Sequence, residues 1–276
     1  MTRKILTFIF VAITCFAATA SNTDDDTPYV KLMSRADSAI AKGDWSIAEN
    51  ALRQAIKTEP ANPANLLLLS NLGMMQFYQG QDSLALETLT RACDIAPRSV
   101  QVLANRATVL EATGKTDEAV RDCNSILEID STYVRARAMR LFSYLRNKEW
   151  QAAQNDLDIL LKQAPDNIMT NIAAGTLYSS TGRYAEAITP FSKVIEMNPQ
   201  AEYYAARAFC RIMTDNINDA SQDIAEGLRI NPLEGELYLY RAMLNKMRYR
   251  AADAKADAER AIQLGVPLKR AQPYLK

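Results

Sequence analysis

A period of about 34 residues runs through almost the whole chain, and it limits the possible folds more than any other feature. Seven alanines recur in register at this nearly constant spacing. They are Ala48, Ala85, Ala119, Ala153, Ala187, Ala220 and Ala254. Twelve residues after each alanine lies a second periodic position, which holds Pro60, Pro97, Ser131, Pro165, Pro199, Pro232 and Val266. Two residue types that keep one period indicate an array of structural repeats.

Each repeat is predicted to form two amphipathic helices. The first helix carries a small residue near its middle: Ala36, Gly73, Ala107, Gly175, Ala208 or Ala242, with Leu141 as the exception. In four repeats it ends near a glycine that can adopt the left-handed conformation of a helix C-cap: Gly43, Gly80, Gly114 or Gly182. The second helix places the periodic alanine on its buried side and ends at the proline, which lacks an N–H donor. The small residues then mark points where two helix backbones come close.

This unit resembles the tetratricopeptide repeat, because small residue, glycine turn, alanine and proline follow one another in that order within each period. The segment TGRYAEAITPFSKVIEMNP, Thr181 to Pro199, is close to an ideal second half of such a repeat. The resemblance covers residues 29–266 and implies an all-α, right-handed superhelix of about seven helical hairpins, whose first helices line a concave face. We expect repeats at about 29–62, 66–99, 100–133, 134–167, 168–200, 201–234 and 235–268, followed by a C-terminal tail at 267–276.

Residues 1–20 have the pattern of a secretory signal peptide. Arg3 and Lys4 precede an apolar run from Ile5 to Phe16, and Ala18 to Ala20 forms a small-x-small cleavage site. The apolar run is shorter than the roughly 20 residues that a spanning helix needs. We therefore expect an exported protein, in the periplasm or cell envelope of a Gram-negative bacterium.

The residues after this signal, 21–28, are expected to form a disordered linker. Attachment to a membrane is expected only if Cys15 is lipidated, and the preceding Ala12-Ile13-Thr14 is a poor context for that modification. The other three cysteines, Cys93, Cys123 and Cys210, lie inside predicted helices. They are interpreted as small packing residues, and one disulfide is the alternative.

Composition argues against catalysis and against binding of nucleic acid. The chain has no histidine, which removes Ser-His and Cys-His nucleophile pairs and histidine-ligated zinc. Its 32 basic and 32 acidic residues are interleaved, whereas nucleic-acid binding requires a clustered basic face. We expect no enzymatic activity, no cofactor and no metal site.

An arginine and an aspartate vary together across the repeats. Arginine precedes the small residue of the first helix at Arg35, Arg106, Arg140, Arg207 and Arg241, and sixteen residues later four of these repeats carry Asp122, Asp156, Asp223 and Asp257. Repeats without the arginine, at Leu72 and Ala174, also lack the aspartate. This covariation predicts ion pairs within each hairpin, partly exposed and contributing about 0.2 to 1 kcal/mol each.

The first helices carry most of the candidate binding residues. Eight of the nine methionines after residue 20 lie there, and flexible thioether side chains suit varied apolar partners. The predicted concave-face residues are Met33, Met74, Phe77, Tyr78, Phe142, Met169, Ile172, Phe209, Met213, Leu239, Met243 and Met247. They predict a groove for a peptide or helical segment of a protein partner, and the alternative is that individual members pack between hairpins.

The predicted function is therefore a non-catalytic scaffold for protein–protein interaction. One alternative is a component of envelope or outer-membrane assembly. A less favoured one is cell-surface glycan capture, which would need long inserted loops that the near-constant spacing does not allow.

Two prolines, Pro267 and Pro273, prevent a full helix in the tail. Either the tail folds back on the last repeat through Leu268, Tyr274 and Leu275, or a partner docks there. The second possibility includes homo-oligomerisation through the C-terminal repeat.

Overall fold

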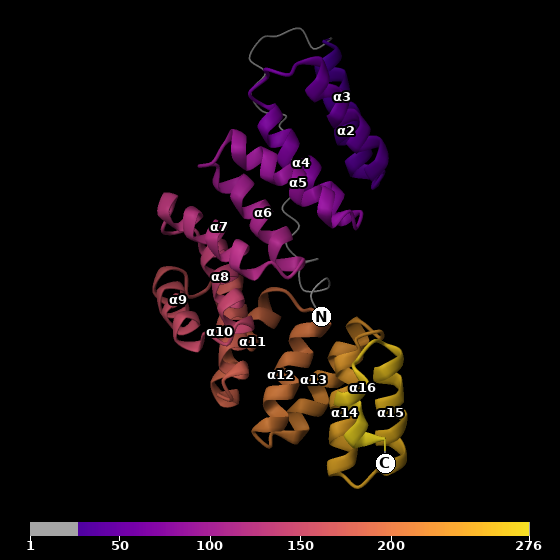
Figure 1. Cartoon of the computed structure of the whole chain (residues 1–276). Coiled ribbons are helices and arrows are strands. Elements are labelled where there is room, and N and C mark those ends of the chain that lie inside the picture. Colours follow the sequence, from indigo (N-terminus) through magenta and orange to yellow (C-terminus); the bar gives the residue numbers. More distant parts are fainter. Residues whose placement is uncertain (1–26, 276) are drawn as a thin grey trace. The chain divides into compact units, whose positions relative to one another are not determined.

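The computed structural model describes residues 27–275, and within this range the chain consists of helices and connecting turns without a β-strand (Figure 1). The signal predicted at residues 1–20 and most of the predicted linker lie outside the described residues. The chain divides into two compact units, Met1–Ser143 and Tyr144–Lys276, which are described one at a time.

Unit 1 is built from helical hairpins. Its helices are α2 (Pro28–Lys42), α3 (Trp45–Thr58), α4 (Asn65–Tyr78), α5 (Asp82–Ile95), α6 (Val100–Ala112) and α7 (Thr116–Ile129), and α8 (Val134–Arg146) runs across the division. Consecutive helices pack in pairs, α2 with α3, α4 with α5 and α6 with α7. The first helices α4 and α6 are also in contact.

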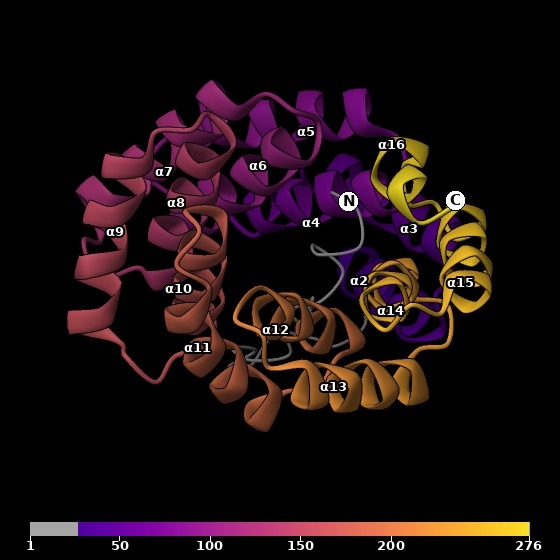
Figure 2. The ribbon, with the colours of Figure 1, turned by 90° about the horizontal axis from the view of Figure 1, so that it is seen from below.

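Unit 2 follows the same plan. Its helices are α9 (Trp150–Gln163), α10 (Ile168–Ser180), α11 (Tyr184–Met197), α12 (Ala201–Met213), α13 (Ile217–Ile230), α14 (Gly235–Met247), α15 (Ala251–Gln263), α16 (Leu268–Ala271) and the 3₁₀ turn η2 (Gln272–Tyr274). The pairs are α10 with α11, α12 with α13, and α14 with α15, and α12 also contacts α14 (Figure 2). The prediction of an all-α array of helical hairpins is confirmed.

The turn inside each hairpin needs one residue in the left-handed region. The four predicted glycines adopt it, with φ from 75° at Gly43 to 82° at Gly80. In the other three hairpins the same position holds Lys148, Asp215 and Tyr249, with φ of 63°, 61° and 59°. A residue with a Cβ atom is strained in this conformation, whereas glycine is not.

Close helix approach explains the small residues. A Cβ atom added to Gly73 would lie 2.5 Å from Leu89 Cγ, and one added to Gly175 would lie 2.7 Å from Phe191 Cε1. The seven periodic alanines are at most 2% exposed, as the period predicts. A larger side chain at these points would hold the two helices of a hairpin apart.

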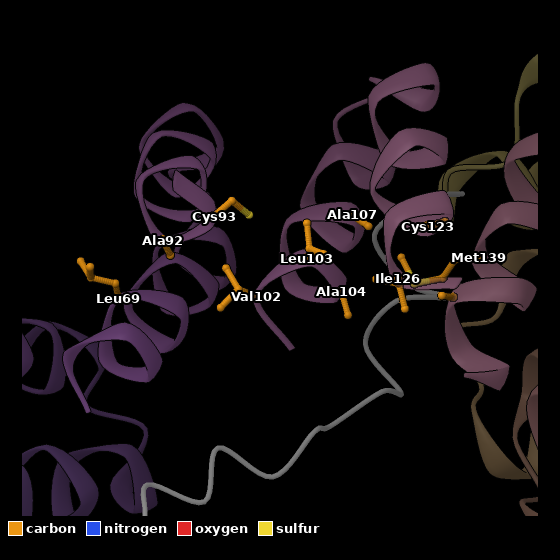
Figure 3. Packing of buried hydrophobic residues seen from close by; sticks show 11 residues of the cluster. Leu69, Ala92, Cys93, Val102, Leu103, Ala104, Ala107, Cys123, Ile126 and Met139 are labelled. Carbon is orange, nitrogen blue, oxygen red and sulfur yellow. The ribbon is translucent and has the colours of Figure 1, made fainter. Parts of the chain in front are cut away.

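Apolar side chains fill the space between successive hairpins. In unit 1 a cluster joins α4, α5, α6 and α7 and includes Leu69, Val102, Leu103 and Ile126 (Figure 3). Cys93 and Cys123 belong to this cluster, and Cys210 packs beside Phe191 in unit 2. All three thiols are buried and none forms a disulfide within residues 27–275, so the interpretation as packing residues is confirmed.

Three of the predicted arginine–aspartate pairs are present within their hairpins. Each arginine donates through Nε and Nη2 to both carboxylate oxygens, over 2.6 to 3.0 Å; the pairs are Arg106–Asp122, Arg207–Asp223 and Arg241–Asp257. Arg140 and Asp156 belong to different units, so that pair stays a prediction.

The expectation that these pairs are partly exposed is wrong for the aspartates. Asp122, Asp223 and Asp257 are only 4%, 2% and 7% exposed. Asp223 also accepts from Arg211 Nη1 at 2.8 Å, and Asp257 accepts from Asn245 Nδ2 at 3.0 Å. The carboxylates lie between the two helices of the hairpin and are satisfied there, as buried charges require.

The C-terminal tail folds back on the last hairpin. Tyr274 and Leu275 pack against a cluster that contains Leu239, Ala258 and Val266. Leu268, the third predicted contact, is instead 59% exposed. The tail therefore covers part of the last hairpin, and homo-oligomerisation through the C-terminal repeat stays a prediction.

Polar contacts fix this tail as well. Arg270 forms a bidentate ion pair with Glu236 on α14, with Nη2 2.7 Å from Oε2, and Lys246 Nζ donates to the carbonyl oxygen of Pro273 at 2.5 Å. Residues 27–275 include no helix with the length and apolarity to cross a membrane.

Candidate peptide-binding surfaces

Three of the twelve predicted binding residues are buried, and for these the prediction of a binding surface is wrong. Met74 and Phe77 are 7% and 6% exposed and pack with Leu89 and Val109 between successive hairpins. Leu239 is 4% exposed and belongs to the cluster that the tail covers. The alternative interpretation, packing between hairpins, describes these three side chains.

The other nine predicted residues keep some contact with solvent. Six are half-buried: Met33, Phe142, Met169, Ile172, Phe209 and Met243. Three are exposed, Tyr78 at 46%, Met213 at 43% and Met247 at 45%. Each unit must be considered by itself, because the exposed residues fall on α4 in unit 1 and on α12 and α14 in unit 2.

In unit 1, polar side chains connect successive first helices. Asn105 Nδ2 on α6 donates to Ser70 Oγ on α4 at 2.9 Å. Arg135 Nη2 on α8 donates to Thr108 Oγ1 on α6 at 3.0 Å, and Ser143 Oγ donates to Glu111 Oε2 at 2.9 Å. Asn105 and Thr108 are each only 5% exposed, so we call Tyr78 and Arg135 the unit 1 face.

Arg135 is the cation of this face, and its donors are only partly used. It is half-buried, its Nε atom is buried without an acceptor, and it makes no ion pair with any described residue. Arg106, also partly buried, has both oxygens of Asp122 as acceptors. A guanidinium carries five N–H donors, so Arg135 has unused capacity for an anionic acceptor.

Tyr78 lies within electrostatic reach of this arginine. Partial burial raises the pKa of the Tyr78 phenol, and the positive charge of Arg135 opposes that rise. The ring is 46% exposed and also lies 6.5 Å, between centroids, from the ring of Trp45. An aromatic ring and an unpaired guanidinium are therefore available on the same unit.

In unit 2 the corresponding helices meet through aromatic rings. Phe209 on α12 stacks on Tyr240 on α14, with centroids 5.3 Å apart and an interplanar angle of 30°. The rings of Tyr184 and Phe209 form a T-shaped pair, with centroids 5.5 Å apart and an interplanar angle of 89°. Burial and the neighbouring Glu236 carboxylate raise the pKa of the Tyr240 hydroxyl.

Two exposed methionines lie at equivalent positions beyond these rings. Met213 and Met247 are one repeat apart, on the contacting helices α12 and α14. Met243, one turn before Met247, is half-buried against the core of the same pair of hairpins. We call Phe209, Met213, Met243 and Met247 the unit 2 face, and it offers apolar, adaptable surface.

The polar contacts of unit 1 were not predicted, because the predicted binding residues are apolar and aromatic side chains on the first helices. A signal was present. Ser70 and Asn105 lie 35 residues apart, about one repeat, and this separation brings them together on adjacent repeats. Thr108 and Arg135, 27 residues apart, also meet across adjacent repeats, although they do not occupy equivalent repeat positions.

A cleft on the second-helix side of unit 1 was also not predicted from the sequence. A cavity of about 500 Å³ is bounded by α5, α6 and α7, with Leu86 and Leu110 as apolar lining. Charges of both signs surround it, among them Arg91, Arg121 and Glu118. No group of three or more side chains arranged to hold a metal ion occurs among residues 27–275.

Comparisons with known proteins agree with the repeat architecture. The tetratricopeptide repeat family model matches residues 33–100 and 143–202. Human DnaJ homolog subfamily C member 7 is 31% identical over 90 residues, which are 31% of this chain and 18% of that protein. Human tetratricopeptide repeat protein 6 is 24% identical over 171 residues, which are 61% of this chain and 32% of that protein. The chain thus spans at most about a third of the length of these curated relatives.

Solved structures resemble the chain over more of its length. A tetratricopeptide repeat protein from Parabacteroides merdae is 27% identical, with a TM-score of 0.73 over 90% of this chain and 97% of that chain. YrrB, described as a tetratricopeptide repeat protein with an unusual peptide-binding site, is 16% identical with a TM-score of 0.51, over 68% of this chain and 97% of its own. At that identity, the likeness to YrrB shows the fold alone.

With the hairpin period, the buried alanines and these matches, the chain is a tetratricopeptide repeat protein. Proteins of this family generally bind protein partners, and the family is generally non-catalytic.

Proposed function

We propose that the chain is a non-catalytic scaffold that binds peptide or helical segments of other proteins on the first helices of its two units. The observation that carries the proposal is the pair of exposed methionines, Met213 and Met247, on contacting helices of unit 2. Apolar side chains that face water on adjacent repeats cost solubility, so their presence favours a partner that covers them.

The two faces would bind different chemistry. The unit 2 face offers thioether and aromatic surface and suits an apolar helical or extended segment. The unit 1 face offers the free donors of Arg135 beside Tyr78 and suits a segment with a carboxylate, because a guanidinium binds that group through two parallel hydrogen bonds.

Peptides selected from a random library displayed on phage would test the unit 2 face. Met213→Ser/Met247→Ser should lower the affinity for selected apolar peptides by about tenfold, because the variant removes two apolar contacts. Met197→Ser is the matched control, since Met197 is 47% exposed but lies on the second helix α11. Equal affinity for the double variant and the wild type, measured by fluorescence anisotropy, would exclude the unit 2 face as the binding surface.

The same library tests the unit 1 face through charge. Arg135→Gln should lower the affinity for peptides that carry a carboxylate by about tenfold and leave the affinity for their carboxamide analogues unchanged. Arg98→Gln removes an exposed arginine from the α5–α6 connection and serves as the control. An equal loss for carboxylate and carboxamide peptides would mean that Arg135 does not bind the anion.

We further propose that the protein is exported and that it acts in the periplasm or cell envelope. Support comes from the basic, apolar and small-residue order of residues 1–20. Intact mass of the protein from expressing bacteria should show a chain that begins at Ser21. A retained Met1, or an acyl group on Cys15, would contradict cleavage at that site.

A further inference from the structure

The loop between α14 and α15 presents the most exposed large hydrophobic side chain in the described chain. Tyr249 is 96% exposed, and Met247, two residues earlier, is 45% exposed. The backbone N–H of Tyr249 closes the end of α14 by donating to the Lys246 carbonyl oxygen at 3.0 Å, but the ring makes no contact that would stabilise the fold. A structural role therefore does not explain the ring.

The backbone at Tyr249 makes the choice of residue more unusual. Its φ of 59° lies in the left-handed region, where four other hairpins of this chain place glycine. A bulky side chain in that region is strained, whereas glycine is not. Strain that the fold does not use often marks a position kept for binding.

The sequence around the ring is mainly basic. From Lys246 to Lys255 it reads KMRYRAADAK, with four cations, Lys246, Arg248, Arg250 and Lys255, and one acid, Asp253. Arg248 Nη2 donates to Ser221 Oγ on α13 at 2.9 Å, which holds its guanidinium beside the loop without neutralising it. Arg250 and Lys255 are exposed.

We propose that this loop docks on a membrane surface that contains anionic phospholipid, with the Tyr249 ring at headgroup level and Arg248 and Arg250 against phosphate groups. Tyrosine prefers the interface between water and lipid, where its ring is covered and its hydroxyl stays hydrated. Clustered arginine and lysine are attracted to the negative potential of such a surface. A ring that protrudes between cations suits a broad, flat, anionic surface.

Vesicle binding tests this proposal. The chain from Ser21 onward is used, because the apolar run Ile5 to Phe16 would bind lipid by itself, and residues 27–275 contain the whole array. Partition onto vesicles of equal parts phosphatidylglycerol and phosphatidylcholine should exceed partition onto pure phosphatidylcholine, and added salt should reduce it. Tyr249→Gly should lower the partition coefficient about fivefold, and Arg248→Gln/Arg250→Gln roughly tenfold or more.

Two measurements make the result specific to this loop. Tyr249→Gly should raise the thermal midpoint while it weakens vesicle binding, because it relieves strain; a variant that lowered both would show that Tyr249 serves the fold and would overturn the proposal. Lys148→Gly, which alters the same left-handed position in another hairpin and also removes a cation, should leave partition almost unchanged. Equal losses for Lys148→Gly and Tyr249→Gly, or equal binding of the wild type to both kinds of vesicle, would refute the assignment. Binding to an acidic protein without binding to the vesicles would refute it as well.

Discussion

The two units share one hairpin design but join their first helices in different ways. In unit 1, Asn105 reaches Ser70 and Arg135 reaches Thr108 through hydrogen bonds between side chains. In unit 2, Phe209 stacks on Tyr240 at the comparable junction. A hydrogen bond specifies direction and partner, whereas ring and thioether contacts tolerate small shifts. The same repeat can therefore carry a face with a fixed polar pattern and a face that adapts.

Buried carboxylates should give the largest difference between the units. Asp223→Ala in unit 2 leaves two arginines, Arg207 and Arg211, without their shared anion and should lower the free energy of unfolding by about 3 to 5 kcal/mol. Asp122→Ala in unit 1 removes the partner of Arg106 alone and should cost less, about 2 to 3 kcal/mol.

Urea titration followed by circular dichroism measures both losses. Asp219→Ala is the control, because this more exposed carboxylate lies 3.9 Å from Arg211 and should change stability by less than about 1 kcal/mol. If Asp223→Ala cost no more than this control, the buried pairs would not hold the hairpins together.

Substitution of single residues at the junctions between first helices should give the next largest losses of stability. Asn105→Leu in unit 1 leaves the Ser70 hydroxyl buried without its donor and should cost about 1 to 3 kcal/mol. Phe209→Leu in unit 2 keeps an apolar contact with Tyr240 and should cost about 1 kcal/mol. Thermal midpoints at matched concentration compare them, and a greater loss for Phe209→Leu would reverse the proposed contrast.

The points of close helix approach inside the hairpins should be equally sensitive to substitution in both units. Gly73→Ala and Gly175→Ala place a methyl group against the buried side chains of Leu89 and Phe191. The clash exceeds the gain in helix propensity, so each variant should lose about 1 kcal/mol net. A stabilised variant in denaturant titration would show that the neighbouring side chain moves aside in that unit.

Thiol reactivity should give the smallest effect, a change in rate without a change in stability. Burial raises the pKa of Cys93 in unit 1 to about 11 and also raises that of Cys210 in unit 2. Because the thiolate is the reactive form, iodoacetamide at pH 8 should modify both slowly until urea unfolds the chain. Mass spectrometry follows the adducts, and rapid labelling of one native thiol would indicate that its hairpin opens locally.

The repeat architecture could be predicted because each device that builds it is local in sequence. The roles of Ala153 and Gly182 depend only on their own helix or turn. The Arg207–Asp223 pair could be predicted because the same two positions can be compared across several repeats of one chain. The left-handed turns at Lys148, Asp215 and Tyr249 could not, since no glycine marks them.

The candidate surfaces were harder to predict, because exposure depends on the neighbouring repeat. Met74 and Met213 look alike in the sequence, yet the first is buried against Leu89 and Val109 while the second is 43% exposed. The missing acceptor of Arg135 could not be predicted either, because the sequence alone does not show whether an arginine has an acidic residue beside it in the fold.

The folded-back tail has a consequence for how the protein comes apart. In a linear array each hairpin is stabilised by the one before and the one after, so the last hairpin would fray first if it had a neighbour on one side only. The α14–α15 hairpin is contacted on both sides, because Arg270 forms an ion pair with Glu236 and Tyr274 packs against the core of the hairpin. Amide hydrogens there should exchange slowly, and deletion of residues 268–276 should turn this end into the point from which unfolding spreads.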